Sequence, residues 1–380
     1  MPPDSLEAGR LLSRFGLLLN LGTGDYERAN ESFTRALAIA QRENDEALEM
    51  RTLAAASDAD FYRLKWSAVL EKNVRVVELA QRANDPHSEA WPHWLAAFSL
   101  LCLGRSEEAM AHATAMLQLA EKLHNRGFLA SAWVMNALAA HTRGEWQVAR
   151  DFYDRELSQG SDSFGFLAYR CLVDFEVGDF TLGEAHLERC MEIVRQAQPG
   201  PTLEYAYTAV VVPLVARITG DSDRLDVAGE AGEAVVGSPT AMTFFASMAR
   251  TGLGLLAVLR EDAAAAGEHY AILREYQGAM SRPGPTVVDR VLGLLAQTMG
   301  NLGQAMSHFE DSLAFCRKAG YRPELAWTCC DYADTLLRRN GEGDQAKAMA
   351  LLDESLAISS KLGMRPLMER VLSRRKILGA

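Results

Sequence analysis

The sequence LGTGDYERANESFTRALAIAQ, from Leu21 to Gln41, decides the fold because its outline returns further along the chain. Related phrases are LGRSEEAMAHATAMLQLAE, RGEWQVARDFYDREL, VGDFTLGEAHLERC and LGQAMSHFEDSLAFCRK. If the aromatic residue of GDY is taken as a mark, the intervals between marks run from 34 to 43 residues, and most are 40. A near-constant interval of this size predicts a solenoid, in which each unit buries its apolar face by stacking on its neighbours. The marks are Tyr26, Trp66, Ser106, Trp146, Phe180, Ser222, Asp262, Leu302 and Gln345.

Residue sizes around each mark predict two antiparallel helices per unit. A glycine two residues before the mark, such as Gly24, ends one helix, because glycine adopts positive φ without steric cost. A small residue three positions after the mark, such as Ala29, and a large one seven after it, such as Phe33, let a bulky side chain fill the gap beside a small one. The predicted fold is therefore all-α, an α-solenoid of about nine antiparallel helix pairs. The other turn glycines are Gly104, Gly144, Gly178, Gly220 and Gly300.

Composition narrows the classes of partner. The 380 residues are 48% hydrophobic and carry a formal charge of -11, which disfavours direct binding to nucleic acid or to anionic lipid. The longest mostly apolar run, AYTAVVVPLVA from Ala206 to Ala216, is too short to span a bilayer. Six dispersed cysteines fit a reducing compartment, so we expect a cytoplasmic protein without disulfides.

These features resemble the tetratricopeptide repeat family over nearly the whole chain. The family outline is matched best by Gly24, Tyr26, Ala29, Phe33 and Ala36. The resemblance implies a right-handed superhelix, although most units are about 40 residues long and the family unit is about 34. We expect the array over 1–365 and a C-terminal capping helix over 366–380, with units near 5–42, 46–84, 88–125, 127–160, 164–198, 202–238, 240–280, 284–319 and 323–362.

Long-helix repeats of this kind, and the ending from Leu351 to Ala380, also look like the C-terminal arrays of MalT and LuxR-type large ATP-binding regulators and of cyclase-linked signalling ATPases. That resemblance implies a sensory region whose partner or effector biases attached ATPase and output domains, which would lie outside these residues.

No motif for catalysis or for a cofactor stands out. The chain lacks GxxxxGK[ST], HExxH and GxSxG, and the acidic run at Asp221, Asp223 and Asp226 lacks the spacing of a calcium loop. Three histidines, His112, His186 and His308, recur at one position of different units and are expected to lie too far apart to share an ion. We therefore predict no enzyme activity, no metal and no cofactor.

The most suggestive feature is an aromatic stripe on the first helix of the third unit. Trp91, Trp94 and Phe98 recur at i, i+3 and i+7, and could either line a concave groove or pack as core between layers. Polar residues of other first helices could face the same hollow. The predicted concave surface is Arg51, Asp58, Tyr62, Trp91, Trp94, Phe98, Asn136, Arg170, Asp174, Arg250 and Arg290. It would bind a protein segment or a small effector; the alternative is a structural module that oligomerises through its open end.

Two local features carry further expectations. Gly229 and Gly232 lie inside a predicted helix, where they indicate either close packing against a neighbouring helix or a hinge. At the start of the chain, Asp4 and Glu7 are expected to form a capping box for the first helix.

Overall fold

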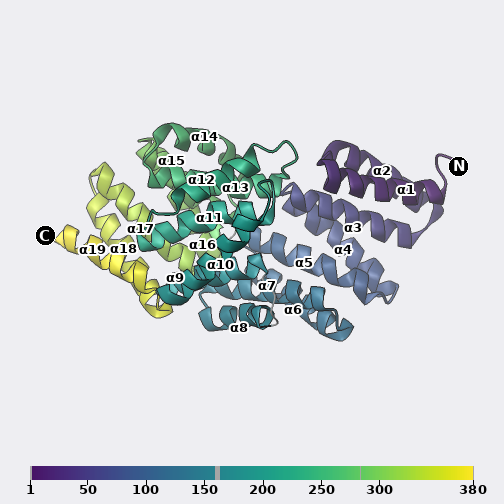
Figure 1. Cartoon of the computed structure of the whole chain (residues 1–380), viewed down its shortest axis with the longest axis horizontal. Coiled ribbons are helices and arrows are strands. Elements are labelled where there is room, and N and C mark those ends of the chain that lie inside the picture. Colours follow the sequence, from purple (N-terminus) through teal and green to yellow (C-terminus); the bar gives the residue numbers. More distant parts are fainter. Residues whose placement is uncertain (1, 159–162, 283, 380) are drawn as a thin grey trace. The chain divides into compact units, whose positions relative to one another are not determined.

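The computed structural model describes residues 2–158, 163–282 and 284–379, and in these ranges it contains nineteen α-helices and one pair of two-residue strands (Figure 1). The helices follow one another as antiparallel pairs, so the predicted all-α helical-repeat fold is confirmed. The expected unit end at residue 160 and the chain end at residue 380 lie outside the described residues. Contacts divide the chain into two compact units. Unit 1 is Met1–Asn136 with Thr240–Phe244, and unit 2 is Ala137–Pro239 with Phe245–Ala380.

Unit 1 contains three complete helix pairs and the first part of α7 (Arg126–Arg143). The pairs stack in chain order, and the first helices of successive pairs contact one another, α1 with α3 and α3 with α5. A short π-helix, η1 (Leu19–Thr23), extends α1. The pairs are α1 (Leu6–Leu18) with α2 (Tyr26–Glu43), α3 (Glu46–Tyr62) with α4 (Trp66–Arg82), and α5 (Pro86–Cys102) with α6 (Ser106–Leu123).

The repeat signature packs as predicted. Ala29 and Phe33 are fully buried in one core cluster. Phe33 lies against Gly16, where an added Cβ would come within 2.7 Å of the ring, so the small residue makes room for the large one. The six predicted turn glycines all have φ between 67° and 82°.

Aspartates begin several helices. Asp45 accepts a hydrogen bond from the backbone N–H of Leu48 at 2.8 Å, which satisfies one of the free donors of the first turn of α3. The predicted capping box of the first helix, with Asp4 as the N-cap, is wrong, because the N-cap of α1 is Ser5. The Ser5 hydroxyl accepts from the N–H of Ala8, so the helix begins one residue later than expected.

Unit 2 contains the remaining helices and an inserted β-hairpin that the repeat pattern did not predict. Strand β1 (Met280–Ser281) pairs antiparallel with β2 (Thr286–Val287) between α14 and α15. The helices are the end of α7, α8 (Trp146–Leu157), α9 (Phe164–Val177), α10 (Phe180–Gln196), α11 (Leu203–Thr219), α12 (Leu225–Val236), α13 (Thr243–Leu259, largely in this unit), α14 (Ala263–Leu273), α15 (Val288–Thr298), α16 (Leu302–Ala319), α17 (Arg322–Arg339), α18 (Asp344–Leu362) and α19 (Arg365–Gly379); a 3-10 turn, η2 (Arg274–Tyr276), follows α14.

The last helices of unit 2 return to its first ones. Helix α19 contacts both α9 and α11. Trp146 Nε1 donates to the carbonyl of Leu362 at 2.7 Å, and Arg365 Nε donates to the carbonyl of Val177 at 3.0 Å. Segments 188 and 216 residues apart in sequence are therefore held together, and the interior of unit 2 is enclosed by its own helices.

The glycines of α12 allow close packing rather than a hinge. A Cβ at Gly232 would lie 2.7 Å from the Leu253 side chain, and one at Gly229 would lie 3.3 Å from Leu256. Both neighbours belong to α13, so α12 lies directly against it through the missing side chains. Of the helices in the described part of the chain, none combines the length and the apolar character needed to cross a membrane.

Candidate binding groove

A groove of about 680 Å³ runs along the first helices of unit 1. It is formed by α1, α3 and α5, with Val76 of α4. Its apolar lining comes from the faces of α1, α3, α4 and α5 that point into the groove. These apolar residues are Leu11, Leu17, Leu48, Met50, Ala54, Ala55, Val76 and Pro92.

Three arginines give the groove a positive charge in an acidic protein. Arg10 and Arg14 of α1 and Arg51 of α3 are exposed and line it, and Asp58 is its only acidic residue. Arg10 lies 3.5 Å from Asp45. Arg14 and Arg51 have no ion-pair or hydrogen-bond partner among the residues that the structure describes. Since most other arginines of this chain are paired, two unpaired guanidinium groups on one groove are available for an anionic ligand.

One wall of the groove is a fixed indole. Trp91 Nε1 donates to Asp58 Oδ1 at 2.9 Å, and the Trp91 ring stacks on Trp94 with a centroid distance of 4.7 Å and an angle of 6°. Burial raises the pKa of the Asp58 carboxyl to about 6, and the hydrogen bond from Trp91 opposes that shift. This carboxyl therefore changes its charge near pH 6, in a groove that three arginines also line.

The predicted aromatic stripe is divided between groove and core. Trp91 lines the groove together with Arg51 and Asp58, which sequence reasoning had placed on the same surface. Trp94, Phe98 and Tyr62 instead surround Phe61. Phe61 also packs against Trp66 and Phe244, and the five ring centroids lie 4.8 to 5.6 Å from its own. These rings pack against one another between the helices of unit 1, with Phe61, Trp66, Phe98 and Phe244 buried and Tyr62 and Trp94 half-buried. Apart from Trp91, the aromatic stripe therefore packs between layers, which was the alternative to lining a groove.

Asn136 and Arg250 lie away from the groove. Asn136 donates to the backbone carbonyls of Ala113 and Ala132 at 3.2 and 2.9 Å, so it joins two helices of unit 1. Arg250 is half-buried on α13 of unit 2. Burial lowers the pKa of the neighbouring His269, and the charge of Arg250 lowers it further.

Three further predicted residues, all in unit 2, are buried in ion pairs rather than facing a groove. Asp174 is fully buried and accepts from Arg150 at 2.6 Å and from Arg170. Arg290 donates to Glu324 at 2.7 Å and to Asp331 at 2.8 Å. A buried charge is stable only when it is paired in this way. Their polar character reflects the internal contacts of unit 2.

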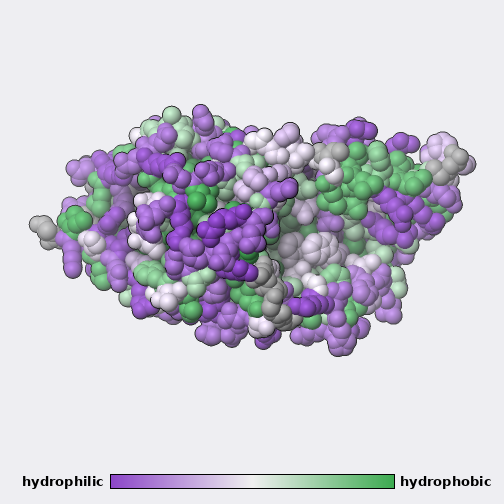
Figure 2. Space-filling view, viewed as in Figure 1, coloured by the Kyte–Doolittle hydropathy of each residue, from purple (hydrophilic) through white to green (hydrophobic). Residues whose placement is uncertain are grey.

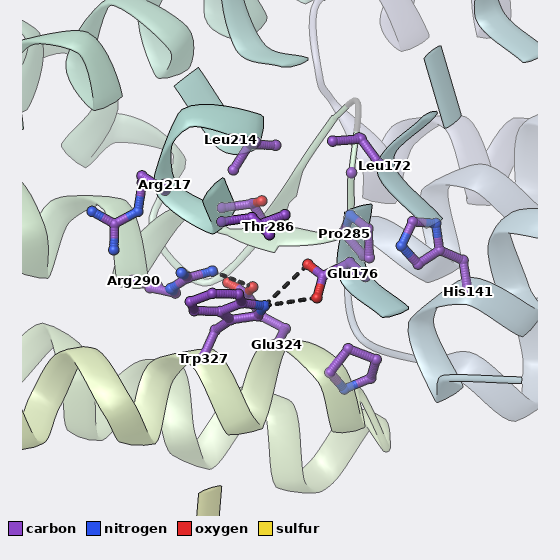
Figure 3. A pocket seen from close by; sticks show the side chains of 13 residues that line it. His141, Leu172, Glu176, Leu214, Arg217, Pro285, Thr286, Arg290, Glu324 and Trp327 are labelled. Atoms are coloured by element: carbon purple, nitrogen blue, oxygen red, sulfur yellow. Dashed lines mark hydrogen bonds and ion pairs between the residues drawn. The ribbon is translucent and has the colours of Figure 1, made fainter. Parts of the chain in front are cut away.

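A small cavity lies in the interior of unit 2, between α9, α11, α17 and the hairpin (Figure 3). Its volume is about 30 Å³, enough for roughly two water molecules. Trp327 Nε1 donates to both carboxylate oxygens of Glu176, at 2.9 and 3.0 Å, and burial raises the pKa of Glu176 to about 7. His141 is 2% exposed and also lines the cavity. No ligand of peptide size fits here.

The β-hairpin fills much of this interior. Arg282 is 5% exposed and donates through Nε to the Tyr169 hydroxyl at 2.7 Å, with its guanidinium 5.0 Å from the centre of the Tyr169 ring. The Val287 N–H donates to Glu324 Oε1 at 2.8 Å. The hairpin is thus bound to α9 through Tyr169 and to α17 through Glu324.

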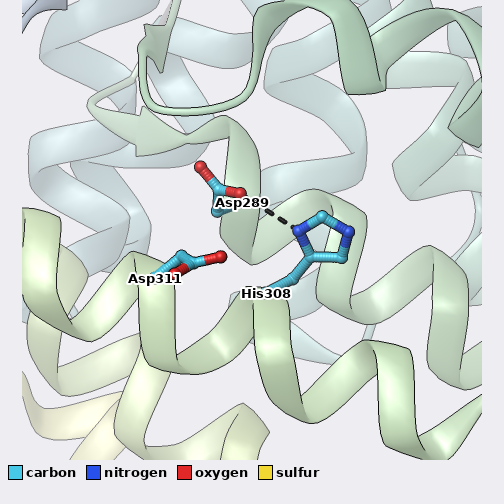
Figure 4. A group of neighbouring side chains, drawn as sticks. All are labelled: Asp289, His308 and Asp311. Carbon is cyan, nitrogen blue, oxygen red and sulfur yellow. Dashed lines mark hydrogen bonds and ion pairs between the residues drawn. The ribbon is translucent and has the colours of Figure 1, made fainter.

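The three histidines compared in the sequence each find a local partner. His112 Nδ1 lies 2.8 Å from His93 Nδ1, and His186 Nδ1 lies 3.1 Å from Asp174. His308 lies with Asp289 and Asp311 in a group whose ligand atoms are within 4.8 Å of one another (Figure 4).

Two members of that group, His308 and Asp289, have hydrogen-bond partners within the protein. His308 Nδ1 is 3.1 Å from Asp289 Oδ1, and His308 Nε2 is 2.8 Å from the Tyr270 hydroxyl. Asp289 Oδ2 accepts from the N–H of Gly278 at 2.6 Å. Both ring nitrogens of His308 and both carboxylate oxygens of Asp289 therefore have hydrogen-bond partners among the described residues.

Sequence reasoning missed Arg10 and Arg14. Their spacing of four residues places them on one side of α1, and this spacing was the signal that could have found them.

No protein-family model matches the chain, and no curated protein sequence matches it. One solved structure similar to it is described as a "Circular tandem repeat protein with novel repeat topology and enhanced subunit contact surfaces". The two share 16% sequence identity with a TM-score of 0.25, over 98% of this chain and 96% of that one. What the present chain binds must therefore follow from its own side chains.

Proposed function

We propose that this chain is a non-enzymatic recognition module, and that the groove of unit 1 binds a polypeptide segment with acidic and apolar side chains. The observation that carries the proposal is the contrast between the two interiors. The groove of unit 1 has about 680 Å³ of free volume, an apolar lining and unpaired arginines, whereas the cavity inside unit 2 has about 30 Å³. A second pocket of unit 2, of about 430 Å³ along α12 to α14, is lined by four acidic residues, Asp226, Glu230, Glu233 and Asp262, and would repel an acidic segment.

The chemistry of the groove selects this class of ligand. A planar guanidinium pairs with a carboxylate through two parallel hydrogen bonds, and Arg14 and Arg51 are free to do so. The apolar lining and the Trp91 ring would bury aliphatic or aromatic side chains of the same segment. The volume lies within the range of roughly 300–1,000 Å³ that is typical of ligand sites.

The sequence resemblance supports a regulatory setting. An array similar to tetratricopeptide repeats, and in particular to the C-terminal arrays of MalT and LuxR-type regulators, would act as the sensory part of a bacterial signalling or transcriptional regulator. Binding in the groove would then bias ATPase and output domains attached to the array.

The proposal is tested with a set of fluorescein-labelled peptides that combine glutamates with leucine or phenylalanine, read by fluorescence anisotropy. We expect Arg51→Glu to weaken binding of the best peptide by about tenfold or more, because the arginine that would pair with a peptide carboxylate is replaced by a side chain that repels it. Arg126→Glu is the matched control, since Arg126 is an exposed arginine of unit 1 that lies outside the groove.

An equal loss of peptide affinity in Arg51→Glu and Arg126→Glu would show that only the net charge of the protein matters, and would contradict a site in the groove. Binding that survives Arg51→Glu, or that is lost only when unit 2 is changed, would also overturn the proposal. Turnover of a substrate by the purified chain would argue against a purely recognising role.

Oligomerisation is the second candidate, because α1 carries exposed apolar side chains. Light scattering over a range of concentrations decides it. A mass that rises with concentration would favour assembly of copies, and a constant monomer mass would leave peptide recognition as the function.

A further inference from the structure

The outer side of α1 carries an apolar face that no other described helix covers. Leu11, Phe15 and Leu18 follow one another at i, i+4 and i+7 and are 56%, 46% and 68% exposed. Leu21, just beyond α1, is 48% exposed. Figure 2 shows hydrophobic residues gathered over this helix. An exposed apolar patch of this kind marks an interaction site on a folded protein.

The face is shaped to receive another chain. It borders a hollow of about 590 Å³, almost entirely apolar, which also includes Pro3, Ala8 and Leu12. A smooth convex helix surface would offer contact but no pocket. Here side chains of a partner could enter between those of α1, as ridges of one helix enter the grooves of another.

The repeat itself indicates what shape of partner fits. Helix α3 has a first helix on each side, α1 before it and α5 after it. Helix α1 contacts α3 on one side, and its residues Leu11, Phe15 and Leu18 stay exposed on the other. The apolar stripe lies at helical spacing, as expected for a surface that accepts a helix in that place.

Charge decides between a second copy and a different protein. The only charged side chains on the hollow are Arg14 of α1 and Arg35 of α2. Two copies that met face to face through this surface would bring these arginines toward one another, and like charges across an interface are unfavourable. A partner with glutamate or aspartate beside its apolar side chains would pair with them instead.

We infer that the outer face of α1 binds an amphipathic helix of another protein, whose apolar side covers Leu11, Phe15 and Leu18 and whose acidic residues meet Arg14 and Arg35. This contact adjoins the groove, since Leu11 and Arg14 border both, and it differs from the groove in Phe15, Leu18 and Arg35, which line only the hollow. It adds a second recognition surface to the one already proposed.

The test uses two synthetic helical peptides with leucines at i, i+3, i+4 and i+7, one flanked by glutamates and the other by lysines. Binding to the full chain is measured by fluorescence anisotropy. We expect the glutamate peptide to bind at least about tenfold more tightly than the lysine peptide. Arg35→Glu should remove or reverse this preference, because Arg35 lines the hollow and not the groove.

Leu18→Glu should weaken binding of the glutamate peptide by about tenfold or more without a change in melting temperature, since an exposed side chain contributes little to folding. Val74→Glu is the matched control, because Val74 is 61% exposed in the same unit and lies outside the hollow. In an Arg51→Glu background, where the groove is weakened, Leu18→Glu and Arg35→Glu should still weaken binding of the glutamate peptide, which separates the contact from the groove.

Three results would overturn the inference. The first is equal affinity for the two peptides, and the second is binding that is insensitive to Leu18→Glu. The third is a dimer of the chain that Leu18→Glu dissociates, which would assign the face to a second copy.

Discussion

At the scale of single residues, Asp58 controls the charge of the groove. It is the one carboxyl on a surface with three arginines, and its hydrogen bond with Trp91 fixes both side chains. Because burial favours its neutral form, the groove gains a negative charge only when the pH rises through about 6. An acidic segment would meet less repulsion below that pH than above it.

We therefore expect an acidic peptide to bind more weakly at pH 7.5 than at pH 5.5, and Asp58→Asn to bind more tightly than the unchanged protein at pH 7.5. The decisive quantity is the ratio of the affinity of the Asp58→Asn variant to that of the unchanged protein, measured at each pH. That ratio should approach one at pH 5. A ratio that does not change with pH would show that Asp58 does not titrate in this range.

The same carboxyl gives a prediction about stability. Its pKa is about 6 in the folded chain against an ordinary 3.8, so the folded state holds the proton more tightly than the unfolded state. Stability is then lost as the pH rises from about 4 to about 6, and the loss persists above 6. Asp58→Asn should raise the free energy of unfolding by about 1–3 kcal/mol at pH 7.5 and leave it unchanged near pH 4, as measured by urea unfolding.

At the scale of elements, α12 is held against α13 by its glycines. Gly232→Ala adds a methyl group 2.7 Å from Leu253. The overlap costs about 1–3 kcal/mol and outweighs the gain of roughly 1 kcal/mol in helix propensity. We expect a net loss of stability, measured by thermal unfolding. Gly303→Ala is the control, because that helical position of α16 is open and should become slightly more stable.

A gain in stability for Gly232→Ala equal to that of Gly303→Ala would mean that α12 does not lie against α13 as described. It would favour the hinge that the glycine spacing also allowed.

The sequence predicted the elements well where the repeat signal was strong. The marks Tyr26, Trp66 and Leu302 are the first residues of α2, α4 and α16. The mark at Asp262 is one residue early, since Asp262 is the N-cap of α14 and the buried small residue is Ala266, not Ala265. No aromatic residue begins that helix, so spacing alone set the register, and spacing tolerates such a shift.

The β-hairpin between α14 and α15 could not be predicted from the repeat. Its strands are two residues long, and its stability comes from Tyr169 and Glu324, which are far away in sequence. For the same reason the groove could be predicted only in part. Arg51, Asp58 and Trp91 were identified from helix position, whereas the burial of Arg290 depends on contacts between distant helices.

At the scale of the whole molecule, the two units build different interiors from the same helical repeat. Unit 1 stacks neighbour on neighbour and keeps its groove free. Unit 2 joins its last helices to its first and fills its interior with paired charges and an inserted hairpin. When one end of a stack that depends only on neighbours is removed, amide hydrogen exchange becomes faster only in the helices next to the cut. In a closed unit, exchange becomes faster at both ends.

This difference predicts the effect of removing α19. Arg365 donates to the carbonyls of Val177 and Gly178 at the end of α9, and Arg370 donates to the carbonyl of Arg217 in α11. In a chain that ends at Leu362, these carbonyls lose their donors, so amide hydrogen exchange should become faster in α9 and α11 and stay unchanged in α1 to α6. Arg375→Ala in the full chain is the control, because Arg375 pairs with Asp353 of the adjacent α18. Faster exchange confined to α18 would show instead that unit 2 is an open stack held together by neighbours alone.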